Sequence, residues 1–393
     1  MLRFLTAGES HGPALTAIIE GMPAGVPVTE DDINRQLARR QVGYGRGGRM
    51  KIETDTARVL SGIRFGRTLG SPIALVIENR DWDNWTEHMK QFGAPEEPVE
   101  PISVPRPGHA DFAGMTKYGT ADLRNILERS SARETAARVA VGAVARCLLD
   151  QLGIRIFSHV LAIGAIDAHP DLSDLDALAE TVERSDLRCG DPAAAERMRL
   201  HIRDTAQAGD TAGGIVQIIA TGLPIGLGSH VHWDRRLDGQ LAGALMSINA
   251  IKGVEVGIGF AAARLTGAQV HDAFYQEDSR IVRKTNNAGG VEGGMSNGQP
   301  IVLQVVMKPI PTLRRPLPSV DLQTGEAVEA HAERSDVCAV PAAGIVAEAM
   351  VAFVISSNII AQFHGDALPD LLLSYRQYME GAGTVITGQG INQ

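Results

Sequence analysis

The segment that decides the fold reads RPGHAD at 106–111, ILERSSARET at 126–135 and AARVAVGAVARCLLD at 136–150. Apolar or small residues occupy nearly every position of its last part, so the sequence predicts a helix over 132–149 that is buried on almost all faces. Ser131 followed by Glu134 fits a capping box, which places the start of this helix at the serine pair. Only the first turn of the helix is then expected to meet a ligand.

Just before this helix, the sequence gathers groups that bind anions and move protons. Arginines can fork onto oxyanions, a histidine can transfer a proton near neutral pH, and a helix N-terminus favours negative charge. The residues concerned are Arg106, His109, Arg129 and Arg133. The combination predicts a phosphate or carboxylate site, although an ordinary capped core helix also accounts for the serines.

Composition narrows the class of partner. The 393 residues include 37 Lys and Arg against 46 Asp and Glu, a formal net charge of −9, which argues against general nucleic-acid binding and favours a small molecule. The three cysteines are far apart and form no Cys-x-x-Cys pair, so neither a disulfide framework nor a metal site is expected. The N-terminus lacks the apolar core of a signal peptide, and a cytoplasmic location is expected.

A second apolar run, 337–355, has the length of a membrane span. Pro341, Gly344 and Glu348 lie inside it, and no second run of this kind follows. The sequence therefore predicts a helix buried in a protein core, and no membrane partner.

The two apolar runs echo each other. Arg129-Ser130-Ser131 precedes the first, and Arg334-Ser335-Asp336 precedes the second, 205 positions later. Two equivalent helices, each preceded by antiparallel strands, predict a duplicated α+β core in which paired helices are covered by sheets.

Elsewhere, apolar patterning and turn signals predict short strands and a few helices. Strands are expected at 4–7, 14–20, 57–65, 71–77, 102–104, 154–166, 215–221 and 253–260, and helices at 31–37 and 238–251. The polar stretch 171–201 is expected to be helical, broken at 189–192, and peripheral. Residues 1–380 are interpreted as one domain and 381–393 as a loose tail.

The segment 35–51 is basic, although the chain as a whole is acidic. It holds six basic residues and no acid, namely Arg35, Arg39, Arg40, Arg46, Arg49 and Lys51. Such a local reversal indicates a polyanionic ligand. Its glycines follow a charged helix instead of an apolar strand, so the dinucleotide fingerprint is rejected. A flexible basic lid is predicted, with a solvated basic loop as the alternative.

Three other segments carry polar or glycine-rich signals. GESHG at 8–12 is a tight turn that exposes Ser10 and His11, although a plain polar turn is an alternative because this is no nucleophile elbow. The stretch 286–298 is too rich in glycine for regular structure and lets backbone amides approach a ligand. With KPIPT at 308–312, it predicts a second ligand-contacting region.

Together these motifs resemble the chorismate synthase family. The matching segments, in the family's order, are 8–12, 39–49, 106–111, 129–136, 289–294, 308–310 and 334–336, and the resemblance covers residues 1 to about 380. It implies an α+β fold, a β-α-β sandwich with central helices between antiparallel sheets and an internal pseudo-two-fold repeat, assembled as a homotetramer. It also implies a lyase that eliminates phosphate from 5-enolpyruvylshikimate 3-phosphate to give chorismate, using reduced FMN without net redox change.

The resemblance implies roles for single residues. His11 is expected to protonate the departing phosphate, His109 to protonate or neutralise the reduced flavin, and Asp336 with Ser10 and Ser130 to tune flavin N5 as the proton acceptor. The implied flavin contacts are Arg129, Ser130, Ser131, Asn249, Ala250, Gly293, Lys308, Pro309, Ile310, Pro311, Thr312 and Arg334. The implied substrate contacts are His11, Arg40, Arg46, Arg49, Arg106 and Arg133.

The reaction explains why these residue types are needed. The substrate brings roughly three to four negative charges and FMN about two more, which requires an arginine-dense pocket. The departing hydrogen is weakly acidic, so a side-chain base with a pKa of about 4 to 7 would remove it only slowly without help. An electron-rich reduced flavin would help by transient electron donation to the C–O bond that breaks.

Some assignments remain open at this point. Arg40 and Arg46 match nicotinamide-nucleotide contacts described in the family, but by chemistry they serve the substrate's anions equally well. No flavin-reductase domain is recognised, so NADPH is expected only indirectly, through a separate reductase.

Two rival functions are a non-catalytic flavin-binding regulator and a polyanion-binding module that uses residues 35–51. The presence of His11, His109 and Asp336 argues against the first. The salt dependence of binding distinguishes the second, because a nucleic-acid binder loses affinity steeply as salt rises, whereas a small enclosed site does not.

Overall fold

The computed structural model describes residues 2–47, 54–278, 280–330 and 335–386. The same order of elements appears in both halves of the chain. The first half contains β1 (Arg3–Ala7), β2 (Ala14–Glu20), α1 (Glu30–Gln41), β3 (Ala57–Ser61), β6 (Ile73–Glu78) and α4 (Thr135–Asp150). The second contains β7 (Arg155–Ile163), β9 (Gly214–Thr221), α7 (Leu237–Met246), β10 (Ile251–Val256), β15 (Ile301–Met307) and α9 (Val340–Phe363).

The two sheets match as well. Their strand orders are β1-β2-β6-β3 and β7-β9-β15-β10, with β8 (Ile166–Asp167) added beside β7. Every neighbouring pair in both is antiparallel. The α+β class and the internal repeat predicted from the sequence are therefore confirmed, and α4 and α9 begin 205 positions apart, the offset of the sequence echo.

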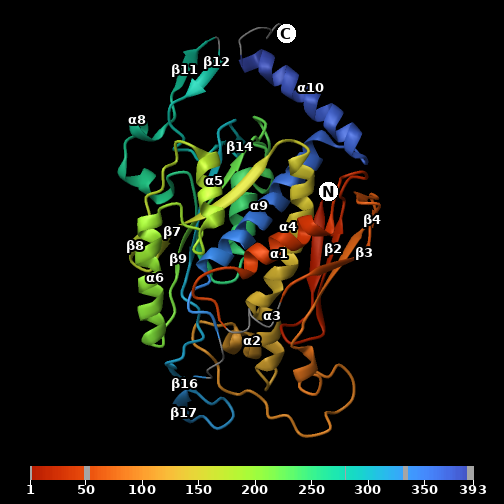
Figure 1. Ribbon diagram of the computed structural model, residues 1–393, viewed down its shortest axis with the longest axis vertical. Coiled ribbons are helices and arrows are strands. Elements are labelled where there is room, and N and C mark those ends of the chain that lie inside the picture. The colour runs from red at the N-terminus through yellow and green to blue at the C-terminus, as the bar shows by residue number, and fades with distance from the viewer. Residues whose placement is uncertain (1, 48–53, 279, 331–334, 387–393) are drawn as a thin grey trace.

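The helices α4 and α9 pack along each other between the two sheets (Figure 1). The first lies against β2 and β6, and the second against β7 and β9, while α1 and α7 pack beside them. A Cβ at Gly142 would lie 2.3 Å from the Cβ of Ala349, so the glycine permits this close approach. By length and hydropathy α9 resembles a membrane span, but most of it is buried inside the protein, and the core accounts for its apolar character.

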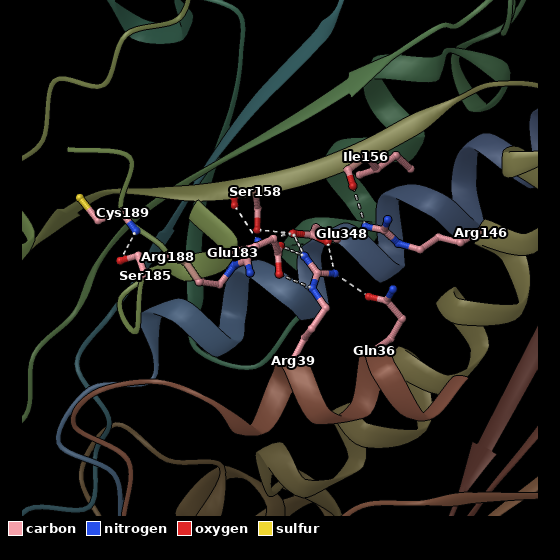
Figure 2. Close-up of polar contacts among 10 residues, drawn as sticks. All are labelled: Gln36, Arg39, Arg146, Ile156, Ser158, Glu183, Ser185, Arg188, Cys189 and Glu348. Carbon is pink, nitrogen blue, oxygen red and sulfur yellow. Dashed lines mark hydrogen bonds and ion pairs between the residues drawn. The ribbon is translucent and has the colours of Figure 1, made fainter. Parts of the chain in front are cut away.

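A buried carboxylate in α9 joins several elements. The Oε2 of Glu348 accepts hydrogen bonds from Arg39 of α1, at 2.8 Å, and from Arg146 of α4. Its Oε1 accepts from Ser158 of β7 at 2.7 Å and from Arg188 at 3.1 Å. Figure 2 shows these side chains converging on one point. We call Glu348, Arg39, Arg146, Arg188 and Ser158 the Glu348 cluster; Glu183 of α5 (Leu175–Arg184) pairs with its outer side.

The remaining elements lie around this core. They are β4 (Ile63–Arg64), β5 (Arg67–Thr68), α2 (Asp111–Tyr118), α3 (Arg124–Ser130), α6 (Pro192–Gln207), α8 (Gly267–Val270), β11 (Phe274–Glu277), β12 (Arg280–Arg283), β13 (Val291–Glu292), β14 (Met295–Ser296), β16 (Pro318–Val320), β17 (Ala327–Glu329) and α10 (Leu368–Ile386). In Figure 1, β11, β12 and α10 lie at one end of the molecule, and α2, α3, β16 and β17 lie at the other.

The start of the central helix differs from the prediction. A separate short helix, α3, ends at Ser130; Ser131 then caps a 3₁₀ turn at Ala132–Glu134, as the predicted start at the serine pair requires, but the α-helix α4 itself begins at Thr135. The N–H of Ser131 is bonded to the carbonyl of Leu127, so it is not available to Glu134, and the hydroxyl of Ser131 accepts from the N–H of Arg133. The predicted capping box does not form.

Three other local expectations were wrong. Residues 102–104 form no strand, because they make isolated backbone bonds to Leu123 and Leu322 instead of a ladder. The helix predicted at 238–251 ends at Met246, since the chain turns into β10. Residues 381–386 continue α10 and are not a loose tail, and the residues after them lie outside the described part of the chain.

Candidate active site

A cavity of about 470 Å³ opens where α4 and α9 begin. Small and apolar side chains of these two helices and of the turns before them form part of its wall, namely Ala132, Ala339, Ala342, Ala343 and Val346. The segments that echo each other in the sequence, Ser130-Ser131 and Ser335-Asp336, both line it. The internal repeat thus places two polar turns around one space, whose volume lies in the usual range of ligand sites, roughly 300–1,000 Å³.

Most predicted site residues meet at this cavity. Those that line it are Ser10, His11, Arg40, Arg46, Arg106, His109, Ser130, Ser131, Arg133, Asn249, Ala250, Lys308, Ile310, Pro311, Thr312 and Asp336.

Three predicted flavin contacts do not line the cavity. Arg129 donates to the carbonyl of Thr6 in β1 and to that of Gly8 just after this strand. Gly293 lies in the turn between β13 and β14, and Pro309 packs beside Gly213. Two other predicted residues, Arg49 and Arg334, lie outside the described residues.

One carboxylate holds two cavity arginines. The Oδ2 of Asp55 lies 3.3 Å from Nη1 of Arg40, and its Oδ1 accepts from Nη1 of Arg133. Arg40 also donates to the Thr135 hydroxyl at 3.0 Å, which fixes its direction. Burial lowers the pKa of Arg40 to about 10, and the charge of Asp55 only partly opposes this effect. Arg40 is therefore still charged at neutral pH.

A second carboxylate organises the RPGHAD motif. Asp111, which is almost fully buried, accepts from Nε of Arg106 at 2.9 Å and from the Arg106 backbone N–H at 3.1 Å. It also pairs with Nδ1 of His109. Burial alone would raise the pKa of Asp111, but the hydrogen bonds and charges of His109 and Arg106 lower it well below its usual range. Both side chains are thus fixed at the cavity by an ionised group behind them.

A third carboxylate contacts His11. Oε1 of Glu128 lies 2.8 Å from Nδ1 of His11, and its Oε2 accepts the His11 backbone N–H at 2.7 Å. The His11 ring is stacked on Trp85, with 3.9 Å between ring centroids. Burial acts to raise the pKa of Glu128, but His11 and Arg124 lower it overall. Glu128 is therefore ionised at neutral pH.

The basic segment proves less flexible than predicted where it is described. Arg46, whose side chain is only 10% exposed, pairs with Asp336 at 2.9 Å. The N–H of Gly47 donates to the same carboxylate at 2.6 Å, and the carbonyl of Gly45 accepts from Val337 at 2.8 Å. Residues 43–47 are thus packed against 335–338, which corrects the prediction of a flexible lid for this part.

Only part of the basic segment faces the cavity. Arg39, adjacent to Arg40 on α1, turns to the Glu348 cluster, and Arg35 is exposed beside Asp32. Residues 48–53, with Arg49 and Lys51, lie outside the described residues. The described basic residues therefore do not form one polyanion-binding surface.

Comparison with known proteins identifies the family. The family model of chorismate synthase matches residues 2–360. The chorismate synthase of Geobacter sulfurreducens is 55% identical, with 97% of this chain and 99% of that protein covered. The chorismate synthase of Moorella thermoacetica is 57% identical, with 97% and 100% covered. The chain belongs to the chorismate synthase family.

A solved structure agrees with this assignment. A crystal structure of chorismate synthase is 43% identical to this chain, with a TM-score of 0.79 and 98% of each chain covered. The resemblance inferred from the motifs is confirmed. Members of this family are carbon–oxygen lyases that act on phosphates in aromatic amino acid biosynthesis; a flavin cofactor and a small-molecule substrate follow from membership.

The cavity fits the flavin expected for a chorismate synthase. Its apolar wall suits a flat ring system, and the amide oxygen of Asn249 is buried there with no hydrogen-bonding partner among the described residues. The same side chain donates to the carbonyl of Ser130 at 3.0 Å, so the amide oxygen remains as an acceptor for a ligand N–H. Ala250 has a left-handed φ of 67°, and such backbone strain at a cavity wall is typical of functional sites.

Its charge also fits an anionic ligand. Five cations line the described part of the cavity, namely Arg40, Arg46, Arg106, Arg133 and Lys308. Three carboxylates, Asp55, Asp111 and Asp336, pair with four of them. Positive charge is therefore in excess in the described wall, as an anionic cofactor and substrate require.

The sequence prediction missed the residues behind the cations and histidines. Asp111 lies in RPGHAD and Glu128 in ILERSSARET. The position of Asp111, two residues after His109, could have indicated that it pairs with this histidine. Asp55 and Trp85 had no local signal, because their partners are brought to them only by the fold.

Proposed function

We propose that the chain catalyses the anti-1,4-elimination of phosphate from 5-enolpyruvylshikimate 3-phosphate to give chorismate, with reduced FMN and no net redox change. The observation that carries this proposal is the convergence of four arginines, a lysine and two histidines on one cavity with apolar walls. The substrate brings a phosphate and two carboxylates, roughly three to four negative charges, which match this excess of cations.

The arginines bind and orient the substrate. Arg40 and Arg133 are held by Asp55, and Arg106 by Asp111, before any ligand arrives. Donors fixed in this way lose little entropy on binding and act strongly in a site from which water is excluded. Because Arg40 is buried in the cavity wall, we assign it and Arg46 to the substrate's anions and not to a nicotinamide nucleotide.

The histidines hold protons at two different places. Nε2 of His11 has no hydrogen-bonding partner in the described part of the chain, and it donates a proton to an oxygen of the departing phosphate. His109, paired with Asp111, protonates or neutralises the reduced flavin. Bound reduced FMN supplies electron donation to the breaking C–O bond and, at N5, acceptance of the C6 proton. Ser10, Ser130 and Asp336 on the cavity wall tune that acceptor.

Several further properties belong to the same proposal. Reduced flavin comes from a separate reductase, so NADPH acts only indirectly. The chain assembles as a homotetramer and works in the cytoplasm.

The decisive test is an anaerobic assay of chorismate formation with dithionite-reduced FMN. His11→Ala and His109→Ala should each lower turnover by roughly 10²–10⁴-fold, the usual contribution of a positioned acid. The spectrum of bound reduced flavin should report changed protonation in His109→Ala only. Absence of chorismate with the unsubstituted protein would refute the proposed function, and the same spectral change in both variants would refute the division of roles.

A further inference from the structure

Glu128 contacts the turn that carries His11 at three points. Its backbone carbonyl accepts the N–H of Ser10 at 3.0 Å. Its Oε2 accepts the backbone N–H of His11 at 2.7 Å, and its Oε1 lies 2.8 Å from Nδ1 of the same residue. The two residues are 117 positions apart in the chain, and the Glu128 side chain is 2% exposed. One residue of α3 therefore fixes both the backbone and the ring of His11.

The chemistry of this contact decides where the hydrogen of the His11 ring sits. An ionised carboxylate only accepts hydrogen bonds, so Nδ1 of His11 carries hydrogen whether the ring is neutral or charged. Nε2, on the other side of the ring, is then the atom that gains and loses the proton. It has no hydrogen-bonding partner among the described residues, and His11 lines the cavity.

The surroundings keep the ring in this orientation. The Trp85 ring covers one face of the imidazole, with an angle of 30° between the two planes. Trp85 is itself held by a bond from Nε1 to Asp81, at 3.0 Å, and Arg124 lies over its ring. Arg124 also donates to Oε1 of Glu128 at 3.0 Å. A flipped imidazole would lie in the same plane against Trp85 but would give up the bond from Nδ1 to the carboxylate, so Glu128 is what distinguishes the two orientations.

We propose that Glu128 is a positioning residue that fixes the Nδ1–H form of His11 and directs Nε2 to the departing phosphate. In the step, the C–O bond breaks and its electron pair stays on the phosphate oxygen. The proton on Nε2 moves to the phosphate group, and His11 is left neutral with its Nδ1 hydrogen still bonded to Glu128. The consequence for turnover rests on the proposed function, whereas the form of the ring does not.

The first experiment measures the ring directly. In protein labelled with ¹⁵N-histidine, the His11 signals, assigned with His11→Asn, should show hydrogen on Nδ1 in the neutral ring. In Glu128→Gln the amide can accept only one of the two His11 bonds, so the Nε2–H form should appear. Glu9→Gln is the matched control, since it removes an exposed acid of the same turn and should leave the ring unchanged. A ring that keeps the same form in Glu128→Gln would overturn the proposal.

The second experiment connects the ring to turnover. Glu128→Gln should lower kcat roughly tenfold to a hundredfold, as loss of an orienting partner commonly does, with little change in KM because the arginines are intact. The double variant Glu128→Gln with His11→Ala should be no slower than His11→Ala alone. Losses that multiply would mean that Glu128 acts independently of His11.

Two checks separate the possible failures. Glu128→Asp keeps a negatively charged carboxylate at this position but has a side chain one methylene shorter. It should therefore retain the Nδ1–H form of His11 and part of the turnover. If Glu128→Gln does not fold, retention of the ring form in Glu128→Asp supports the proposal, and its loss of that form contradicts it. If the unsubstituted protein makes no chorismate, the proposed function fails, while the NMR result still decides the ring.

Discussion

Two groups of buried arginines lie next to each other in this protein, and α1 contributes to both. Arg39 belongs to the Glu348 cluster, and Arg40 lines the cavity. In the Glu348 cluster, three arginines converge on one carboxylate of the protein itself (Figure 2). In the cavity, the carboxylates stand behind or beside the arginines, and the middle is open.

The difference teaches how to distinguish a structural ion cluster from a binding site. Both groups are buried, and both contain more arginines than carboxylates among the described residues. What differs is the position of the anion. A carboxylate at the centre completes the network and stabilises the fold, whereas carboxylates at the periphery orient the arginines toward an anion that the protein does not supply.

The largest expected effect is on the Glu348 cluster. Glu348→Gln should lower the free energy of unfolding by about 3–5 kcal/mol, because it leaves buried guanidinium groups without their partner. Chemical denaturation measures this change. Ser158→Ala, which removes one hydrogen bond but no charge, should cost only about 1.5 kcal/mol. A loss below about 1 kcal/mol in Glu348→Gln would contradict the structural role of the cluster.

The stabilisation that Glu348 provides should depend on pH. Burial alone would raise the pKa of Glu348, but the charges of Arg39, Arg146 and Arg188 lower it below the ordinary value of 4.5. A lowered carboxyl pKa contributes stability that is present above the unfolded pKa and lost as the pH falls through the folded pKa. The difference in unfolding free energy between wild type and Glu348→Gln should therefore be constant near neutral pH and shrink below about pH 4.5. A difference that grows on acidification would refute this assignment.

The next effect concerns the arginines of the cavity. Arg46→Ala should raise the KM for substrate roughly tenfold to a hundredfold, since a charge-assisted hydrogen bond contributes about 1.5–3 kcal/mol. Stability should change less than in Glu348→Gln, because Asp336, which loses its partner, is 19% exposed at the cavity. Steady-state kinetics and melting measure the two effects, and Arg46→Lys should recover part of the affinity. An unstable variant with unchanged kinetics would move Arg46 into the structural class.

Part of the fold and of the site could be predicted from the sequence. The two apolar helices and their echo follow from local patterning, and so do the arginines and histidines of the site, because each lies in a recognisable motif. The carboxylates that orient them do not. Asp55 meets Arg133 across 78 positions and Glu128 meets His11 across 117, and no local periodicity encodes such pairs.

Local rules failed where a neighbouring element intervened. The capping box at Ser131 was lost because α3 had already taken its N–H. The strand expected at 102–104 lacked a partner strand to form a ladder. The first error arises from competition for one backbone group and the second from the absence of a pairing strand beside the segment, and the sequence pattern reveals neither.

A smaller effect is coupling between the two ligands of the cavity. Oxidised FMN should bind more tightly when the phosphorylated substrate is present, because the substrate closes the pocket over the flavin. Coupling of about 1–3 kcal/mol corresponds to roughly 5- to 150-fold in affinity. Titration followed by flavin fluorescence measures it, with inorganic phosphate as the control for charge alone. Equal flavin affinity with and without substrate would remove the basis for a shared, closed site.

The smallest expected effect is that of salt. Charges in an enclosed cavity are screened weakly, so the KM for substrate should change only about twofold to threefold between 50 and 200 mM sodium chloride. A protein that neutralises 6–10 phosphates on a nucleic acid loses roughly 10³–10⁵ in affinity over the same range. Sodium phosphate at matched ionic strength is the control, since phosphate ions compete for the cavity arginines and should raise the KM more than chloride does. A steep rise of the KM in chloride would place the substrate's anions on an exposed basic surface. The contrast between the cavity arginines and the Glu348 cluster would then not describe how this protein binds its substrate.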